Sequence, residues 1–172
     1  MARKYSKNLI DEPKLNENDF SVMEKLYRQL YIDKHNQFNP KYNTQWFEEV
    51  YRLKYYTFRV FKEDKDILAF VIFYKTSETI FPLIVGYDRS NENKKLYEIL
   101  FGSLLKDSLS SNLELFLSGG ASSYKKNRGT ETHFEFEAVY YDHLPLHRKL
   151  PWKLIKLMYD KFAQRIYSED II

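Results

Sequence analysis

Three ionisable side chains share one face of a strand predicted over residues 133–141. His133, Glu135 and Glu137 are spaced by two residues, so they point the same way from an extended chain. A carboxylate or an imidazole held near an amine can accept a proton from it. We therefore predict that Glu135 or Glu137 serves as a general base. The alternative is that both carboxylates lie on a solvated face and pair with Lys or Arg side chains.

A basic segment follows the glycine pair at 119–120. Tyr124, Lys125 and Arg128 combine positive charge with a turn whose backbone N–H groups can be free, which suits a phosphate or a carboxylate. We predict that these three residues bind substrate, and the alternative is a solvated basic helix face. Tyr124 and Tyr140 are candidate acids. With 15 tyrosines in the chain, the alternative for each is packing with a satisfied hydroxyl.

Other reaction centres are not indicated. His143 and His147 have a metal-like spacing, but Pro145 lies between them and no carboxylate pair completes four ligands, so we expect no metal. The sequence contains neither a Gly-x-Ser-x-Gly motif nor a Walker loop, which argues against serine hydrolases and nucleotide hydrolases.

Composition sets the class of protein. The 172 residues are 44% hydrophobic and 30% charged with five Gly and five Pro, which fits one globular domain and excludes disordered and collagenous chains. The absence of Cys excludes disulfides, thiolate zinc sites and a cysteine nucleophile. A net charge of +3 does not demand nucleic acid. The charged opening and the lack of a long apolar run predict a cytoplasmic protein without membrane insertion.

Hydrophobic spacing predicts the elements that position these residues. Residues 67–74 are apolar throughout, so this strand should lie at the centre of a sheet. Pro82 is tolerated only at an edge or a bulge. Ser21 and Glu24 suggest a capping box for the first helix. The predicted order is a tail or first edge strand over 1–18, helices over 20–36 and 43–54, strands over 55–62, 67–74 and 79–87, a helix over 96–110, a strand over 113–117, a loop with a short helix over 118–129, a strand over 133–141 and a last helix. That last helix should have Pro151 in its first turn and bury Trp152, Ile155, Tyr159, Phe162 and Ile166.

Two spaced motifs resemble a known family. They are Ser118-Gly119-Gly120-Ala121-x-x-Tyr124-Lys125-x-x-Arg128-Gly129 and Ala138-Val139-Tyr140-x-x-His143-Leu144-Pro145, followed by Arg148 and Trp152. Together with the element order, over roughly residues 20 to 165, they resemble the GNAT-fold acyltransferases of the FemAB-like group, which include the BioF2-like acetyltransferase domain. The resemblance implies a mixed α/β (α+β) fold with a mostly antiparallel central sheet flanked by helices. We expect residues 1–18 to be a polar tail and 19–172 a single GNAT-like domain.

The resemblance also implies where the acyl donor binds. In that fold the strand before the crossover helix bulges and splays from its neighbour, and the acyl thioester enters the gap. Pro82, Val85, Gly86 and Tyr87 would then bind acyl-CoA, with acetyl-CoA as the simplest co-substrate. The chain departs from the family where Gly-x-Gly or Gly-x-Ala would hold the pyrophosphate, because it has a single glycine there, Gly86.

These features lead to one main hypothesis and two alternatives. The main hypothesis is an N-acyltransferase that transfers an acyl group from an acyl-CoA to a small-molecule amine by direct attack. The first alternative is an aminoacyl-tRNA-dependent transferase of the FemAB type, with a tRNA-linked donor. The second is a non-catalytic GNAT-like module that binds a protein or a nucleic acid. A homodimer or a second GNAT-like domain would be the partner of a chain of this kind.

Overall fold

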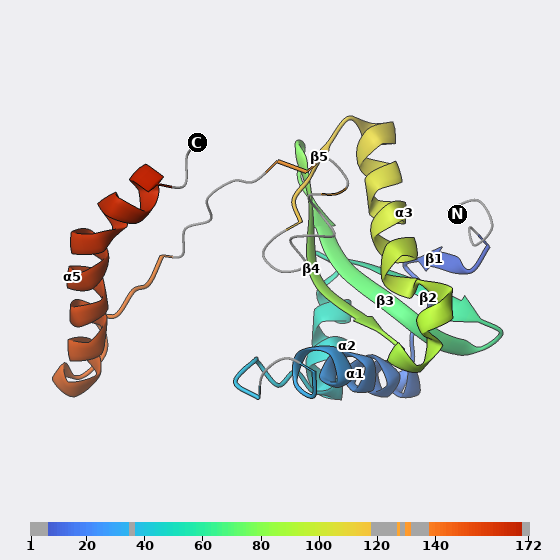
Figure 1. Cartoon of the computed structure of the whole chain (residues 1–172). Coiled ribbons are helices and arrows are strands. Elements are labelled where there is room, and N and C mark those ends of the chain that lie inside the picture. The colour runs from blue at the N-terminus through green and yellow to red at the C-terminus, as the bar shows by residue number, and fades with distance from the viewer. Residues whose placement is uncertain (1–6, 35–36, 118–126, 128–129, 132–137, 170–172) are drawn as a thin grey trace. The chain divides into compact units, whose positions relative to one another are not determined.

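The computed structural model describes residues 7–34, 37–117, 127, 130–131 and 138–169 (Figure 1). The chain divides into two compact units, Met1–Arg128 and Gly129–Ile172, and each is described by itself. Over these described ranges, every helix is too short or too polar to cross a bilayer.

The first unit is built on a five-stranded sheet. Its strands are β1 (Leu9–Asp11), β2 (Thr57–Glu63), β3 (Asp66–Lys75), β4 (Thr79–Tyr87) and β5 (Glu114–Leu115), and they lie in the order β1-β2-β3-β4-β5. All neighbours are antiparallel except β4 and β5, which are parallel. The apolar strand β3 is central, as predicted, because neighbouring strands and helices cover it on every side. Of the two alternatives for residues 1–18, the described part contains an edge strand.

Helices cover both faces of this sheet (Figure 1). Helices α1 (Glu17–Tyr31) and α2 (Thr44–Leu53) pack on one face around Phe47 and Phe70, and α3 (Leu96–Ser111) packs on the other around Phe73 and Leu100. Large side chains fill both cores because β2 and β3 direct successive residues to opposite faces. The predicted mixed, mostly antiparallel sheet flanked by helices is confirmed.

The first helix starts earlier than the sequence suggested. Asn16 is the N-cap, and its side chain and that of Asp19 each accept a backbone hydrogen bond from the other residue at 3.1 Å. The prediction that Ser21 and Glu24 form the capping box is therefore wrong. Glu24 instead accepts hydrogen bonds of 2.6 Å from the backbone N–H and the hydroxyl of Thr44, so it ties the start of α2 to α1.

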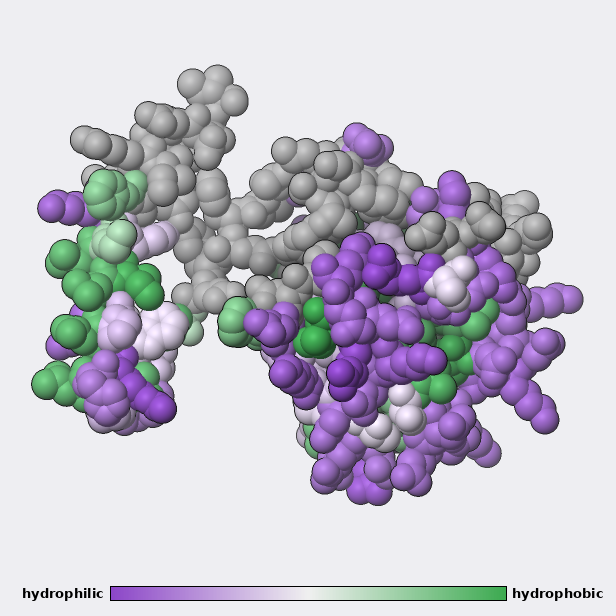
Figure 2. Space-filling view, turned by 60° about the horizontal axis from the view of Figure 1, so that its bottom comes forward, coloured by the Kyte–Doolittle hydropathy of each residue, from purple (hydrophilic) through white to green (hydrophobic). Residues whose placement is uncertain are grey.

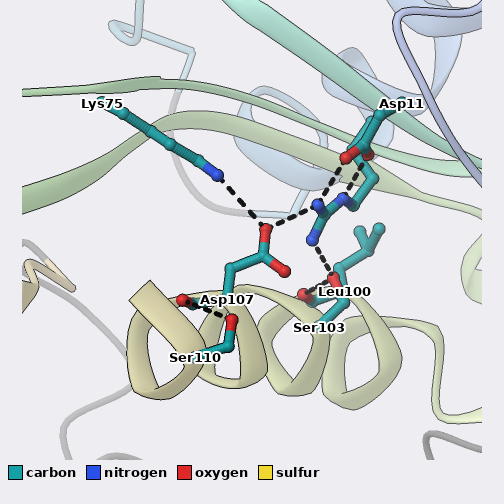
Figure 3. A network of polar contacts seen from close by, with 7 residues as sticks. Asp11, Lys75, Leu100, Ser103, Asp107 and Ser110 are labelled. Atoms are coloured by element: carbon teal, nitrogen blue, oxygen red, sulfur yellow. Dashed lines mark hydrogen bonds and ion pairs between the residues drawn. The ribbon is translucent and has the colours of Figure 1, made fainter. Parts of the chain in front are cut away.

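A buried arginine joins the sheet to α3 (Figure 3). Arg59 on β2 is 6% exposed and donates to both carboxylate oxygens of Asp11 on β1, at 2.5 and 2.7 Å. It also donates to Asp107 at 2.7 Å and to the hydroxyl of Ser103 at 2.8 Å, both on α3. Burial lowers the pKa of the Arg59 guanidinium, but the hydrogen bonds to the two carboxylates outweigh it and hold that pKa above its usual value.

The second unit contains helix α5 (Leu146–Glu169). It begins after Pro145, whose carbonyl accepts from the N–H groups of Arg148 and Lys149, so Pro151 lies inside the helix and not in its first turn. Within this unit, Trp152 is 37% exposed, and the other described members of the set predicted to be buried are about half exposed. Figure 2 shows hydrophobic residues along the surface of this helix. The Ile166 side chain lies outside the described part of the chain.

The strand predicted over 133–141 is only partly within the described residues. Residues 138–141 have no regular secondary structure, so this end of the predicted strand is wrong. Alternation of apolar and polar residues indicates an extended chain with one apolar face. It does not show whether another strand lies beside that chain to pair with it. Residues 132–137 lie outside the description, as does the loop with a short helix predicted between 118 and 129, apart from 127.

Candidate functional site

Strand β4 carries a bulge at its middle. Phe73 on β3 lies opposite Pro82, but the next residue along β3, Ile72, lies opposite Ile84. Leu83 is thus an extra residue without a partner on β3, and it is 48% exposed. A bulge fits here because Pro82 has no N–H to donate to the ladder. The expectation that Pro82 marks a bulge is confirmed.

The pairing of β4 with β5 is short. The two strands pair only at Thr79 with Glu114 and at Ile80 with Leu115, and the Phe116 N–H then donates to the Ile80 carbonyl at 3.0 Å. Within the described residues, no strand pairs with this edge of β4 past Ile80. The resemblance expects the splay along this part of β4, and we refer to it by that name.

Register decides which backbone groups face the splay. The Asp88 N–H donates to the Leu68 carbonyl of β3 at 2.8 Å. Backbone groups point alternately to the two sides of an antiparallel strand. The N–H and C=O groups of Gly86 and Ile84 therefore also point to β3, whereas those of Val85 and Tyr87 point to the opposite edge. Two of the residues predicted to bind the donor therefore present their backbone groups to the splay.

A tyrosine that the sequence analysis did not single out reaches this edge. The Tyr31 side chain, in the last turn of α1, lies beside the Val85 backbone, which acts on its hydroxyl. Burial raises the pKa of Tyr31, the Val85 N–H opposes the rise, and Tyr87 and Tyr42 add to it. Tyr31 therefore keeps its phenolic proton at neutral pH and can donate it at the edge of β4. Its spacing in the sequence indicated only a buried helix face.

The neighbouring Tyr27 is hydrogen-bonded to the segment that connects α1 and α2. Its ring stacks on that of Tyr31 at 4.6 Å, and its hydroxyl donates to the Pro40 carbonyl at 2.6 Å. Burial, followed by the influence of Tyr42 and Tyr31, raises the pKa of Tyr27 to about 12. Tyr27 has a backbone partner outside the splay, so Tyr31 is the member of the pair that faces β4.

Gly86 has a packing role. A Cβ built on it would lie 2.3 Å from Cε1 and 2.8 Å from Cζ of Phe70, a fully buried ring. Only a residue without a side chain leaves room for this ring, and this explains the single glycine without any ligand.

The turn after β4 is already filled by a carboxylate. Asp88 accepts from the N–H and the hydroxyl of Ser90, at 2.9 and 2.7 Å, and from the side-chain amide of Asn91 at 2.6 Å. Burial raises the pKa of Asp88, but these hydrogen bonds and the charge of Lys25 outweigh it and lower that pKa below its usual value. A pyrophosphate placed on this turn would compete with a fixed negative charge, so the turn itself fits that group poorly.

A short helix separates this turn from α3. It is η1 (Arg89–Lys94), and α3 then begins after Lys95, whose backbone is left-handed and whose side chain makes no capping hydrogen bond. The connection is thus a capped turn followed by a second helix start, in place of one glycine-rich turn entering α3 directly.

The remaining predicted site residues are distributed as follows. Pro82, Val85 and Tyr87 lie together on β4. Tyr140 belongs to the second unit, is 72% exposed and has its ring 5.4 Å from that of His143. The others lie outside the described residues, namely Tyr124, Lys125, Arg128, Glu135 and Glu137.

Several solved structures are similar to this chain in fold. A possible acetyltransferase from Clostridium difficile 630 has a TM-score of 0.58 at 10% identity, covering 78% of this chain and 99% of that one. The ribosomal-protein-alanine N-acetyltransferase of Brucella melitensis has a TM-score of 0.58 at 12% identity, covering 77% and 97%. AAC(6')-Iy in complex with the bisubstrate analog CoA-S-monomethyl-acetylneamine has a TM-score of 0.53 at 12% identity, covering 79% and 99%.

No protein-family model matches the sequence, and neither does any curated protein. At these identities the likeness concerns the fold. The chain has the GNAT acetyltransferase fold.

Proposed function

We propose that this protein is an N-acyltransferase that moves an acyl group from an acyl-CoA, most simply acetyl-CoA, to the amine of a small molecule. The observation that carries the proposal is the bulge at Leu83 together with the edge of β4 past Ile80 that no described strand pairs. There, Val85 and Tyr87 present backbone groups that can hold the amides of a pantetheine arm as a neighbouring strand would. A substrate amide bound at the Val85 backbone would also lie beside the Tyr31 hydroxyl.

The proposed reaction is direct attack of the amine on the thioester carbonyl. The amine nitrogen forms the C–N bond, the C–S bond breaks, and a base takes the proton that the amine loses. Tyr31, which keeps its proton, donates a hydrogen bond to the sulfur as negative charge develops on it. Glu135 and Glu137 remain our candidates for the base, Tyr140 for an acid, and Tyr124, Lys125 and Arg128 for substrate binding.

Replacing Tyr31 tests this role. Tyr31→Phe keeps the ring but removes the hydroxyl, and we expect turnover with acetyl-CoA, followed as release of the free thiol in a screen of primary amines, to fall by about 10-fold or more. Tyr27→Phe is the matched control, because its hydroxyl binds the Pro40 carbonyl and should leave turnover within about two-fold once the protein is folded. Equal losses in both variants would remove Tyr31 from the mechanism.

The filled turn at Asp88 favours a second candidate function. A carboxylate in this position weakens the site for a CoA pyrophosphate, which motivates either the tRNA-linked donor of the FemAB-like group or a GNAT-like module that binds without catalysis. Calorimetric titration with CoA, acetyl-CoA and a long-chain acyl-CoA separates these readings. Micromolar binding that depends on the acyl group supports the acyl-CoA enzyme. No binding to any of them, with binding to an aminoacylated tRNA, supports the FemAB type.

We further propose that residues 19–172 act as one GNAT-like domain in the cytoplasm. A homodimer or a second GNAT-like domain is the proposed partner, and light scattering of the purified chain tests the homodimer. A monomer with full turnover would remove the need for one.

A further inference from the structure

Helix α3 is apolar on more than its buried face. The residues that it buries are Leu96, Ile99, Leu100, Ser103, Leu104 and Ser108. A second row of large apolar side chains, spaced by four residues, runs towards its outer side and consists of Tyr97, Phe101, Leu105 and Leu109. A helix that is apolar all round is usually covered on both sides. The second row therefore indicates a partner for α3 in addition to its own sheet.

This row is open to solvent over its second half. Leu105 is 44% exposed and Leu109 is 76% exposed, and the ring of Phe101 lies 4.3 Å from that of Tyr97. A Cβ built on Gly102, beside the row, would meet nothing within 4 Å. Single apolar side chains are common on protein surfaces, whereas contiguous ones mark a contact site. The row therefore has the character of an interface.

The apolar row is symmetric along the helix. Tyr97 and Leu109 lie six residues to either side of Ser103. Phe101 and Leu105 lie two residues to either side of it. A second α3 that runs in the antiparallel direction would therefore match every apolar residue of the row with another apolar residue. A face that complements its own reversed copy suits a two-fold interface between identical chains.

The charges beside this row follow the same symmetry. Glu98 and Lys106 lie four residues to either side of Gly102 and carry opposite charges. Glu98 also lies 3.9 Å from Lys95 of its own chain, but such partly exposed pairs contribute little. In an antiparallel pair, Glu98 of each copy would approach Lys106 of the other, whereas a parallel pair would place like charges together. Charge complementarity thus favours a second copy of this chain, in the antiparallel direction.

We propose that α3 is the interface of a homodimer, in which it crosses α3 of a second copy close to Gly102 and Ser103. Phe101 of each copy packs against Leu105 of the other, and interdigitation of the two rows sets a crossing angle of about −50°. One helix face is smaller than a standard interface of about 1,600 Å², so the dimer should dissociate in the micromolar range. This inference rests on the homodimer proposed above and not on the acyl-transfer reaction.

Sedimentation velocity of the full chain between about 1 and 100 μM tests the interface. We expect a reversible dimer, and Leu105→Glu should weaken it by about 10-fold or more, because the new carboxylate would be buried against Phe101 of the other copy. Leu53→Glu, at the end of α2, is the matched control, because Leu53 is similarly exposed at 54% and lies outside α3. It should leave dimerisation within about two-fold of the parent. A parent that stays monomeric up to about 100 μM would overturn the homodimer and its surface together. A dimer that Leu105→Glu leaves intact would overturn the surface alone.

Exchange of the two charges tests the antiparallel direction. Glu98→Lys and Lys106→Glu should each weaken the dimer by about 5-fold, because each places like charges opposite one another on both sides of the two-fold axis. The double variant restores opposite charges, and its dimer should return to within about two-fold of the parent. A double variant no tighter than either single variant would overturn the proposed arrangement. None of these measurements uses an acyl donor, so turnover remains a separate test of the proposed reaction.

Discussion

Replacing Gly86 by alanine separates a packing role from a ligand-binding role at this position. The added Cβ would lie 2.3 Å from Cε1 of Phe70, whereas ordinary contacts begin at 3.4 Å, so the ring would have to retreat by about 1.1 Å. Phe70 is fully buried and packs edge-on against Phe47 with ring centroids 5.7 Å apart. The ring therefore has little room to move.

The two opposing effects of this substitution can be weighed. Overpacking a tight core costs about 1–3 kcal/mol. Alanine also restricts the unfolded chain, which returns about 0.4–1 kcal/mol where the backbone conformation is compatible. We expect Gly86→Ala to lower the free energy of unfolding by about 1–2 kcal/mol. In a Phe70→Leu background, where the ring is absent, the same substitution should cost less than about 0.5 kcal/mol.

Urea unfolding in a Trp152→Phe background measures this effect in the first unit. Trp46 is then the sole tryptophan, and it packs against Phe47 beside Phe70. Gly102→Ala on α3 is the matched control, because a Cβ there meets nothing within 4 Å and should stabilise the helix by up to about 1 kcal/mol. Our reasoning is refuted if Gly86→Ala is as stable as the parent, or if its cost is the same with and without the Phe70 ring. Unchanged stability with lost acetyl-CoA binding would instead assign Gly86 to the donor.

Two further predictions concern charged groups. Asp107→Asn removes one of the two carboxylates that neutralise Arg59 and should lower the free energy of unfolding by about 1–3 kcal/mol. The control Asp64→Asn, at an exposed position, should change it by less than about 0.5 kcal/mol. Equal effects of the two variants in urea unfolding would contradict the role of Asp107 in neutralising Arg59. The folded-state pKa of Asp88 is lowered, so its stabilising effect is present above the ordinary Asp value near 4 and is lost as the pH falls through the folded pKa. The difference in urea midpoint between the parent and Asp88→Asn should hold from about pH 7 to 5 and shrink as the pH falls below the ordinary Asp value near 4. A difference that stayed the same down to the lowest pH at which the protein folds would show that charge is not its source.

Much of the sheet could be predicted from sequence because its patterns are local. The third strand was predicted over 79–87, the bounds that β4 has. The unbroken apolar run of β3 indicated burial on both sides, and Pro82 indicated a bulge. The start of α1 was missed because two capping patterns overlap there, and only tertiary structure shows that Glu24 serves Thr44.

The site was less accessible to sequence reasoning. Pro82, Val85 and Tyr87 followed from the resemblance, because one strand positions all three. Tyr31 is distant from them along the chain, and the spacing of a helix cannot reveal which strand edge a hydroxyl will reach. The resemblance assigned Gly86 to the donor, and the sequence alone could not show that the ring of Phe70 packs against it.

The Arg59 network also has a consequence for synthesis of the chain. Arg59 lies 48 residues after Asp11 and 48 residues before Asp107, so its two acidic partners flank it symmetrically along the sequence. When β2 leaves the ribosome, Asp11 is already available but Asp107 is still to be made. Since a buried guanidinium needs both carboxylates, β1 and β2 should remain loosely held until α3 emerges, and the sheet should close in one late step rather than strand by strand.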